Sequence, residues 1–406
     1  MAERVRKHKS DLTILFLIIV LMVIGLIVIY VVGPMRAKVL NSAYGMDYSS
    51  DYFFIHHTIN ILLSLGVLFV GFKVVSYEKV SKIAKWLIIA ALGASALLWI
   101  LSEVGSSMAV CELGACRWFK IAGVSFQPAE FLKLSLVIYF ANFIARKKKE
   151  GELGTKSFWI PFALISALSL YFVIVKQSDL GTGLAIIAII IGMLFMSGIS
   201  MSQFMAAIGL IGLVGVLVVA ITPYRMERLM TFVGGGDDES SYHVENAMMA
   251  IGTGGFLGVG IGNSVQATGY LPESLNDSVF AVMGETFGFV GLLMILLIFS
   301  TILFKMLKIS EHTEDTERRL YVVGVFSWIF MHVVANIMSM TGLIPVTGVT
   351  LPLLSYGGTS MLFISFGLGL VMQLSCYTGR EVIKDESISS RRGFRGSYHT
   401  GRRSRP

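Results

Sequence analysis

Long apolar stretches separated by short polar segments dominate the chain from residue 12 to residue 378. A helix needs about 20 predominantly apolar residues to cross the hydrocarbon layer of a bilayer. Ten stretches approach or exceed that length: 12–33, 53–74, 84–102, 128–145, 157–175, 180–198, 203–222, 278–304, 320–341 and 360–378. Only the segment KQSDLGT separates the fifth stretch from the sixth, so we expect a very tight hairpin there. The pattern predicts an all-α polytopic membrane protein with ten transmembrane helices.

The basic residues set the orientation of these helices. Of the 33 lysines and arginines, 25 fall on the side of the N-terminus, seven on the other side, and Lys133 within a span. Lysine and arginine are retained in cytoplasmic loops. We therefore expect both termini in the cytoplasm and call the opposite side outer.

Composition supports a membrane location and divides the chain into three parts. The chain is 55% hydrophobic and 15% charged, with a mean hydropathy of +0.75 and a net charge of +7. The positive charge follows from inner loops and tails, so it implies no nucleic-acid partner. We expect a basic N-tail at 1–10, a membrane domain at 11–379 and a basic C-tail at 380–406. The C-tail would be a solvated segment beside anionic lipid or a docking tail for a cytoplasmic partner.

The longest outer loop, residues 223–277, lies between spans seven and eight and is rich in glycine in its second half. Such a run forms a poor long helix. It suits half-helices packed against protein, where irregular backbone is tolerated at membrane depth. Two interpretations stay open: close packing of helices, which we favour, or a backbone cradle for a phosphate group. Its glycines are Gly252, Gly254, Gly255, Gly258, Gly260 and Gly262.

Charged residues in or beside a span are costly, which makes them functional candidates. Glu130 and Lys133 stand three residues apart on one predicted helix and can pair, either as a structural ion pair or as a substrate contact. Gln177 and Asp179 lie in the tight hairpin, where Asp179 can cap the next helix.

Two further pairs follow the same logic. Arg225 and Arg228, also three residues apart, could hold a diphosphate or anchor the loop to lipid headgroups. His332 and Asn336 stand four residues apart within span nine, where hydrogen bonds between helices are the expected role.

Asp277 directly precedes the apolar stretch of span eight. It could cap that helix. Alternatively, it is a carboxylate at the outer rim, where partial burial would raise its pKa toward that of a useful general base.

Two cysteines, Cys111 and Cys116, share the outer loop between spans three and four. A disulfide is chemically permitted on that side. We expect two free thiols in preference to a bond. No cysteine and histidine cluster has the spacing of a zinc site.

Five segments in order along the chain resemble the SEDS family (shape, elongation, division and sporulation), which includes FtsW, RodA and SpoVE. They are ACRWFKIAGVSFQPAEFLKL, KQSDLGTG, YRMERLMTF, AIGTGGFLGVGIGNSVQATGYLPESLNDSVFAVMGETFGFVG and TGLIPVTGVTLPLLSYGGTSMLFISFGLGL. The resemblance runs from about residue 115 to 370 and includes ten spans with both ends inside.

The resemblance implies a peptidoglycan glycosyltransferase that polymerises lipid II outside the bacterial cytoplasmic membrane, with a class B penicillin-binding protein and divisome proteins as partners. The family's essential acid falls on Asp277, which would be the general base, with undecaprenyl diphosphate leaving. Cations would stabilise the diphosphate, with or without Mg²⁺ or Mn²⁺. The candidate substrate contacts are Arg117, Glu130, Lys133, Gln177, Asp179, Arg225, Arg228, Gln266, Glu285, Ser355 and Tyr356.

The chain departs from the family pattern at several motif positions. It reads QSDLGT where QPDLGT is common, has Thr286 where a second acid is usual, and has Ala267 where a basic residue is frequent. Leu275 and Asn276 replace the usual His and Thr before the acid. These changes bear on substrate contacts more than on the reaction. Gly284 and Thr350 resemble the septal, FtsW-like branch, with RodA-like elongation as the alternative; lipid II flipping and scaffolding are competing functions for the family.

Overall fold

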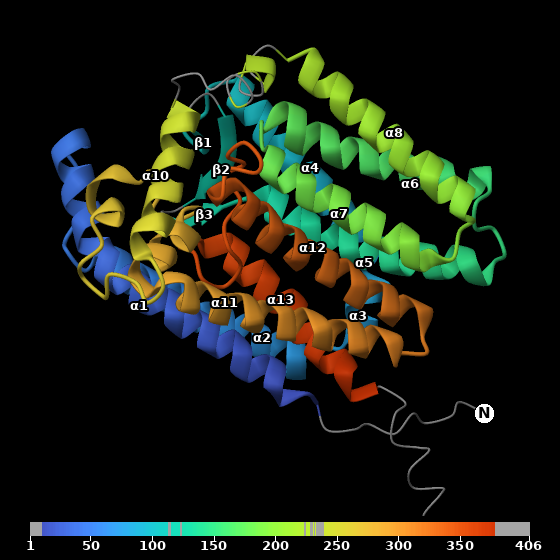
Figure 1. Ribbon diagram of the computed structural model, residues 1–406. Coiled ribbons are helices and arrows are strands. Elements are labelled where there is room, and N and C mark those ends of the chain that lie inside the picture. The colour runs from blue at the N-terminus through green and yellow to red at the C-terminus, as the bar shows by residue number, and fades with distance from the viewer. Residues whose placement is uncertain are drawn as a thin grey trace, which may run out of the picture.

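The computed structural model describes residues 10–112, 115–121, 124–222, 225–227, 230, 232 and 239–377, and Figure 1 shows their helices gathered into one bundle. Within these residues ten helical segments are long and apolar enough to cross a membrane, which confirms the predicted number. They are α1 (Leu12–Tyr44), α2 with η1 (Tyr52–Val74), α4 (Ala84–Glu103), α5 (Pro128–Lys149), α6 with η2 (Lys156–Lys176), α7 (Leu180–Ser197), α8 (Met201–Ala220), α11 (Val279–Glu311), α12 (Thr316–Met340) and α13 with η4 (Gly358–Tyr377).

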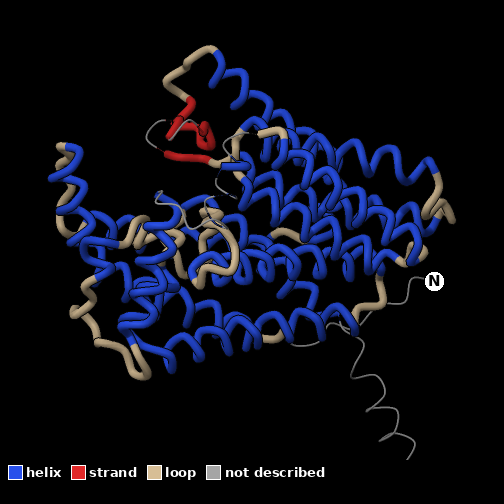
Figure 2. Tube along the Cα trace, turned by 45° about the horizontal axis from the view of Figure 1, so that its top comes forward, coloured by secondary structure: helices blue, strands red, loops and turns tan. Residues whose placement is uncertain are grey.

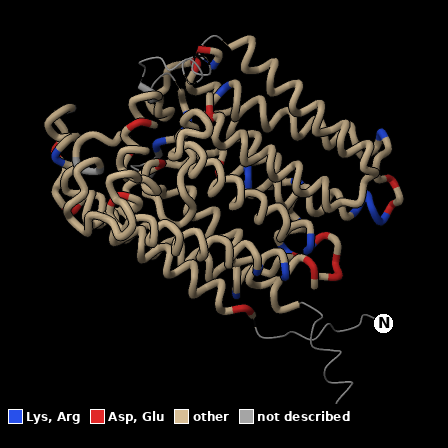
Figure 3. The backbone as a smooth tube through the Cα atoms, in the orientation of Figure 1, with Lys and Arg blue, Asp and Glu red and all other residues tan. Residues whose placement is uncertain are grey.

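Charged residues lie mainly at the two ends of the bundle. Figure 3 shows lysine, arginine, aspartate and glutamate gathered toward these ends, and α1 begins at one of them, the predicted inner end (Figure 1). At that inner end, Lys305 contacts Asp11 at 2.6 Å and Arg318 contacts Glu78 at 2.8 Å. The short inner helix α3 (Tyr77–Lys82) precedes α4. The two predicted tails lie largely outside the described residues, which run from 10 to 377.

The centre of the bundle is made by α5, α7 and α12. Most of α5 is buried, whereas α8 buries none of its residues and lies at one edge in Figure 1. The difference follows from sequence, because α5 carries polar groups that need protein partners in lipid. In contrast, α8 is apolar on every face and can be solvated by acyl chains.

Helix α1 is longer than the sequence predicts. Its 33 residues span about 50 Å, against a hydrocarbon thickness of about 30 Å. The apolar pattern ends near residue 33, but the helix continues through Arg36 and Lys38 to Tyr44, and Gly45 ends it with a φ of 63°. We call residues 34–44 the α1 extension.

A small antiparallel sheet, drawn as strands in Figure 2, occupies the outer loop before α5 and was not predicted. Its order is β1 (Ala109–Glu112), β2 (Ala115–Ile121), β3 (Val124–Phe126). Cys111 and Cys116 are paired across β1 and β2 and form a disulfide, so the expectation of free thiols was wrong. The two residues face each other across a hairpin, which is why the thiols meet.

The glycine-rich half of the outer loop packs against a break in α11. This loop contributes α10 (Glu239–Gly254) and the short η3 (Gln266–Tyr270). At Gly288, α11 leaves helical geometry, and the amides of Val259 and Gly260 bond the carbonyls of Glu285 and Thr286 at 2.9 and 3.1 Å. A Cβ on Gly258 would lie 2.2 Å from the Thr286 carbonyl oxygen. Close packing is therefore the role of Gly254 and Gly258, whereas Gly255, Gly260 and Gly262 meet no such close contact and instead adopt positive φ values. The freed carbonyls of the broken helix find donors.

Candidate active site

The turn Pro272–Ser278 places Asp277 at the entry to α11. The helix begins at Val279 with Ser278 as its N-cap, so Asp277 is not the cap that one interpretation proposed. The side chain of Asp277 is 6% exposed, and no described lysine or arginine forms a salt bridge with it. Burial, followed by the negative charge of Glu273, raises the pKa of Asp277 to about 7. A carboxyl group with that pKa can both accept and release a proton near neutral pH.

Three parts of the chain distant in sequence hold this turn, two through its backbone and one through the Ser278 hydroxyl. Asn336 of α12 donates to the Asp277 carbonyl at 2.6 Å, and the Tyr356 amide donates to the Leu275 carbonyl at 2.8 Å. His243 of α10 contacts the Ser278 hydroxyl at 2.6 Å. These contacts fix the turn, while the Asp277 carboxylate forms no salt bridge with a described lysine or arginine and lies 3.5 Å from the Ser278 hydroxyl. Hydrogen bonds from Ser278 and from backbone groups of the turn lower the pKa of Asp277, but by less than burial and Glu273 raise it.

Glu130 and Lys133 form the predicted pair in the first turns of α5. Lys133 Nζ lies 2.6 Å from Glu130 Oε1 and 2.9 Å from His332 Nε2, and all three side chains are buried. His332 Nδ1 faces the Thr350 carbonyl at 3.3 Å, which assigns its proton to Nδ1 and leaves Nε2 as the acceptor for Lys133. His332 therefore makes the predicted bond between helices, to Lys133 of α5. Asn336, one turn further along α12, donates instead to carbonyls of two loops.

The α6–α7 hairpin gathers a second group of predicted residues. Asp179 accepts from the Thr182 amide at 2.9 Å and caps α7, as expected, and Gln127 donates to its other oxygen at 3.2 Å. Gln177 is buried and its amide atoms have no partner among the described residues.

Two guanidinium groups converge on the same hairpin. Arg117 donates to the carbonyls of Gln177 and Ser178 at 3.3 and 2.9 Å, and Arg225 donates to the Ile174 carbonyl. Burial lowers the pKa of Arg225, although a guanidinium stays charged. Both groups therefore bind backbone carbonyls, Arg225 in a buried position and Arg117 in a partly exposed one. Arg228 lies outside the described residues.

Glu285, Gln266 and Ser355 shape the surroundings of the turn. The Glu285 carboxylate accepts from the amides of Val265 and Gln266 at 2.8 and 3.1 Å, so it fixes the loop before the Asp277 turn. The Ser355 hydroxyl accepts from the Leu351 amide at 2.9 Å and closes the loop before α13. Tyr356 lies at the end of that loop, with its ring centroid 5.9 Å from that of His57.

The hairpin and the Asp277 turn meet through the loop before α13. A Cβ on Gly181 of α7 would touch Val349 and the Thr347 carbonyl, so α7 packs tightly on that loop. Asn336 donates to the carbonyl of Val349 at 2.7 Å as well as to that of Asp277. One buried amide thus joins the segments that carry the fourth and fifth matching motifs, and the second motif packs on the fifth through Gly181.

Sequence reasoning missed the roles of Gln127, His243 and Ser278. Gln127 precedes the proline that begins α5, a position where a polar side chain can reach a neighbouring loop, and that signal was available. His243 lies on α10, and nothing in its local sequence indicates a contact with Ser278.

A metal centre built by the protein alone has no support in the described part of the chain. No group of three or more His, Cys, Asp or Glu side chains lies together in those ranges. The cation candidates there are the side chains Arg117, Lys133 and Arg225. We therefore derive no chemical step through a bound metal.

Comparison with known proteins gives one answer. A family profile described as "Cell cycle protein", covering FtsW, RodA and SpoVE, matches residues 11–380. Stage V sporulation protein E of Bacillus subtilis is 32% identical over 92% of this chain and 99% of its own length. A probable peptidoglycan glycosyltransferase FtsW of Haemophilus influenzae is 30% identical over 90% of each chain.

Solved structures show the same fold. A chain from a structure described as "Structural coordination of polymerization and crosslinking by a peptidoglycan synthase complex" aligns with a TM-score of 0.72 and 22% identity, covering 90% of this chain and 97% of that one. Rod shape determining protein RodA of Thermus thermophilus aligns with a TM-score of 0.64 and 22% identity, covering 91% of this chain and 98% of that one. With ten candidate spans and a family match over nearly its whole length, the chain is a multi-pass bacterial membrane protein that belongs to the FtsW/RodA/SpoVE family.

Proposed function

We propose that this protein is a peptidoglycan glycosyltransferase that polymerises lipid II into glycan strands at the outer face of the cytoplasmic membrane, with Asp277 as the general base. The activity is the one named for its FtsW relatives. The observation that carries the role of Asp277 is its burial without a salt bridge to any described lysine or arginine, in a turn held by three other parts of the chain.

The proposed step moves one proton and exchanges one bond. The 4-hydroxyl oxygen of an acceptor sugar attacks the anomeric carbon of a lipid-linked donor, and its proton passes to the Asp277 carboxylate. A glycosidic bond forms as the bond from the anomeric carbon to undecaprenyl diphosphate breaks. A base with a pKa of about 7 suits this work, because it is partly ionised at neutral pH and holds the proton that it receives.

The leaving diphosphate carries developing negative charge, which cations stabilise. Arg117 and Arg225 meet at the α6–α7 hairpin, and Lys133 lies in the first turns of α5. We propose that these groups, with Arg228, set the potential at the diphosphate, while Glu130, Gln177, Asp179, Gln266, Glu285, Ser355 and Tyr356 shape the site around the sugars. A divalent cation, if one takes part, would be held in large part by the diphosphate oxygens.

We further propose a class B penicillin-binding protein as partner and the division septum as the place of work. The proposal of a crosslinking partner is supported by the structural relative, which comes from a peptidoglycan synthase complex that coordinates polymerisation with crosslinking. The septal role follows from the FtsW-like motif residues, with RodA-like elongation as the alternative. A flippase would need charges near the bilayer midplane. The buried charges of this chain favour outer-face chemistry, because Glu130 and Lys133 lie within two turns of the outer end of α5.

The test is Asp277→Asn in purified protein with labelled lipid II and gel-resolved glycan products. Asparagine has nearly the same shape but does not accept the hydroxyl proton. Loss of a general base costs roughly two to four orders of magnitude in rate. We expect strand synthesis to fall by that amount while the protein stays folded and still binds its partner.

Asp51→Asn is the matched control. Asp51 is an exposed outer acid that makes no side-chain capping bond to α2, so this variant should polymerise at the wild-type rate. Near-normal synthesis by Asp277→Asn would remove Asp277 from the mechanism and favour the flippase or scaffold alternatives.

A further inference from the structure

The α1 extension is fixed at its far end. Gly45 ends the helix, and its amide bonds the Asn41 carbonyl at 3.1 Å. The Asn41 side chain then forms two hydrogen bonds of 2.9 Å with the backbone of Tyr48, in the connection to α2. The extension is therefore a helical arm tied back to the outer end of α2.

Arg36 links this arm to the Asp277 turn. Its Nη2 lies 3.4 Å from Glu273 Oε1, and Asn276 donates to the other oxygen of the same carboxylate. The Glu273 carbonyl accepts from the amides of Asn276 and Ser278 at 2.9 and 3.3 Å. Glu273 also holds a φ of 46°, which is uncommon for a residue with a side chain. Glu273 thus accepts hydrogen bonds from Asn276 and Ser278 inside the turn, and Arg36 contacts its carboxylate from a different helix, α1.

The turn is held from a second direction by parts of the same outer framework. Tyr356, whose amide bonds the Leu275 carbonyl, places its ring edge-on to Phe53 of α2 at 5.5 Å. Phe53 in turn lies 5.9 Å from the ring of Tyr48, where the arm is anchored. The two contacts that fix the turn, one from Arg36 and one from Tyr356, therefore both come from segments that pack against the outer end of α2.

We propose that the α1 extension positions the Asp277 turn through the contact between Arg36 and Glu273, which makes both of them positioning residues for the reaction. The expected effect on catalysis rests on the proposed function. The contact between Arg36 and Glu273 rests on geometry alone. The pair is partly exposed, with Arg36 at 24% and Glu273 at 48%, so its effect should be modest and should weaken in salt.

Several charged or titratable groups face this turn. Glu273 belongs to the turn itself, Arg36 comes from α1, and His243 comes from α10 through Ser278. Asn336, the α12 contact to Asp277, is uncharged, with His332 one turn away on the same helix, and Tyr356 comes from the loop before α13. Among these, Glu273 and Arg36 carry opposite charges and should have opposite effects on the ionisation of Asp277. Removing the charge of Glu273 should favour ionisation of Asp277, and removing Arg36 should disfavour it.

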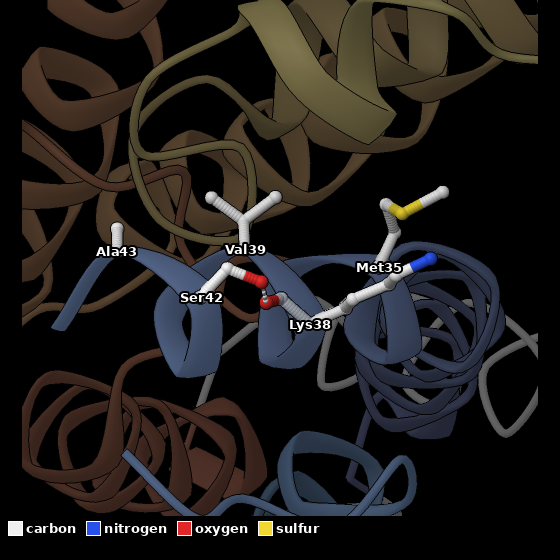
Figure 4. Close-up of a pocket in the computed structure, with 5 residues that line it drawn as sticks. All are labelled: Met35, Lys38, Val39, Ser42 and Ala43. Atoms are coloured by element: carbon white, nitrogen blue, oxygen red, sulfur yellow. Dashed lines mark hydrogen bonds between the residues drawn. The ribbon is translucent and has the colours of Figure 1, made fainter. Parts of the chain in front are cut away.

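The experiment compares Arg36→Ala, Glu273→Gln and Glu273→Ala with Lys38→Ala. Lys38 is the matched control because it loses the same charge from the same arm. Its side chain instead lines an open hollow of about 390 Å³ with Met35, Val39, Ser42 and Ala43 (Figure 4). Hydrogen exchange of the segment 271–278 is measured in the purified full chain at low and high salt, and polymerisation is measured from pH 5.5 to 8.5.

We expect the amides of 276 and 278 to exchange roughly two- to fivefold faster in Arg36→Ala and Glu273→Ala, as suits a partly exposed ion pair, and at the wild-type rate in Lys38→Ala. The acid limb of the polymerisation profile should move to lower pH in Glu273→Gln and to higher pH in Arg36→Ala. Wild-type exchange in Arg36→Ala, or acid limbs that do not move, would overturn the proposal. If the wild-type protein polymerises no lipid II, the proposed function fails. The hydrogen-exchange rates then still show whether the α1 extension stabilises the Asp277 turn.

Discussion

Glu130 and Asp277 are two buried acids at the outer end of one membrane domain, and their surroundings differ in one respect. Glu130 lies 2.6 Å from the ammonium group of Lys133, which also contacts His332. Asp277 is almost as well buried but has no salt bridge to a described lysine or arginine, and the charge next to it is the negative Glu273.

The difference shows that burial alone does not determine the proton affinity of a carboxyl group; the charge of its neighbours matters as well. A buried carboxylate beside a cation forms a fixed contact that offsets part of the cost of burying both groups. A buried carboxyl group beside a like charge is driven toward its neutral form, which gives it a proton affinity useful in catalysis. The sequence shows two acids near the starts of spans, and only the three-dimensional structure shows that Glu130 has a cationic partner and that no described lysine or arginine forms a salt bridge with Asp277.

The largest effect should follow from breaking the paired acid. Lys133→Met leaves the buried charge of Glu130 without its cation, which typically costs about 3–5 kcal/mol of stability. We expect a marked loss of thermal stability in detergent and poor recovery of folded protein. Glu130→Gln should also destabilise, by less, because Lys133 keeps His332 as an acceptor.

The double variant sharpens this result. Because the two residues share one contact, Glu130→Gln with Lys133→Met should cost less than the sum of the single changes. The measurement is a double-mutant cycle on unfolding midpoints, read by size-exclusion chromatography after heating. Strictly additive losses would contradict a direct pair.

A smaller effect should follow from loosening the unpaired acid. Asn336→Leu removes the donor to the carbonyls of Asp277 and Val349, and a buried acceptor left without a donor costs about 1–3 kcal/mol. We expect polymerisation to fall about tenfold with a modest loss of stability, since a small displacement of a catalytic group is costly in rate. The control is Asn142→Ala, which removes a 2.9 Å bond to Ser81 at the inner end of α5 and should affect stability without affecting activity.

The membrane domain could be predicted from sequence where a local rule dominates. Apolar length gave the ten spans, helical spacing gave the pair of Glu130 and Lys133, and the position before an apolar stretch gave the Asp179 cap. These features depend on residues within a turn or two of one another, so a single sequence suffices.

The remaining features depend on contacts between distant segments. The break at Gly288 is stabilised by amides some 30 residues earlier, and the α1 extension continues through a polar stretch that no hydropathy rule marks as helical. The disulfide between Cys111 and Cys116 requires a hairpin that hydropathy does not reveal. The same holds for the convergence of Asn336, Val349 and Asp277, which only the packing of α12 against two loops brings about.

The rate of lipid II polymerisation as a function of pH tests the central claim most directly. If Asp277 accepts the proton, kcat/KM in the wild-type protein should rise with pH, reach half its plateau near pH 7, and be about tenfold below the plateau at pH 6. The residual activity of Asp277→Asn should show no such rise. A wild-type profile that is flat from pH 5.5 to 8.5, in protein shown to stay folded throughout, would contradict the role of Asp277 as a base.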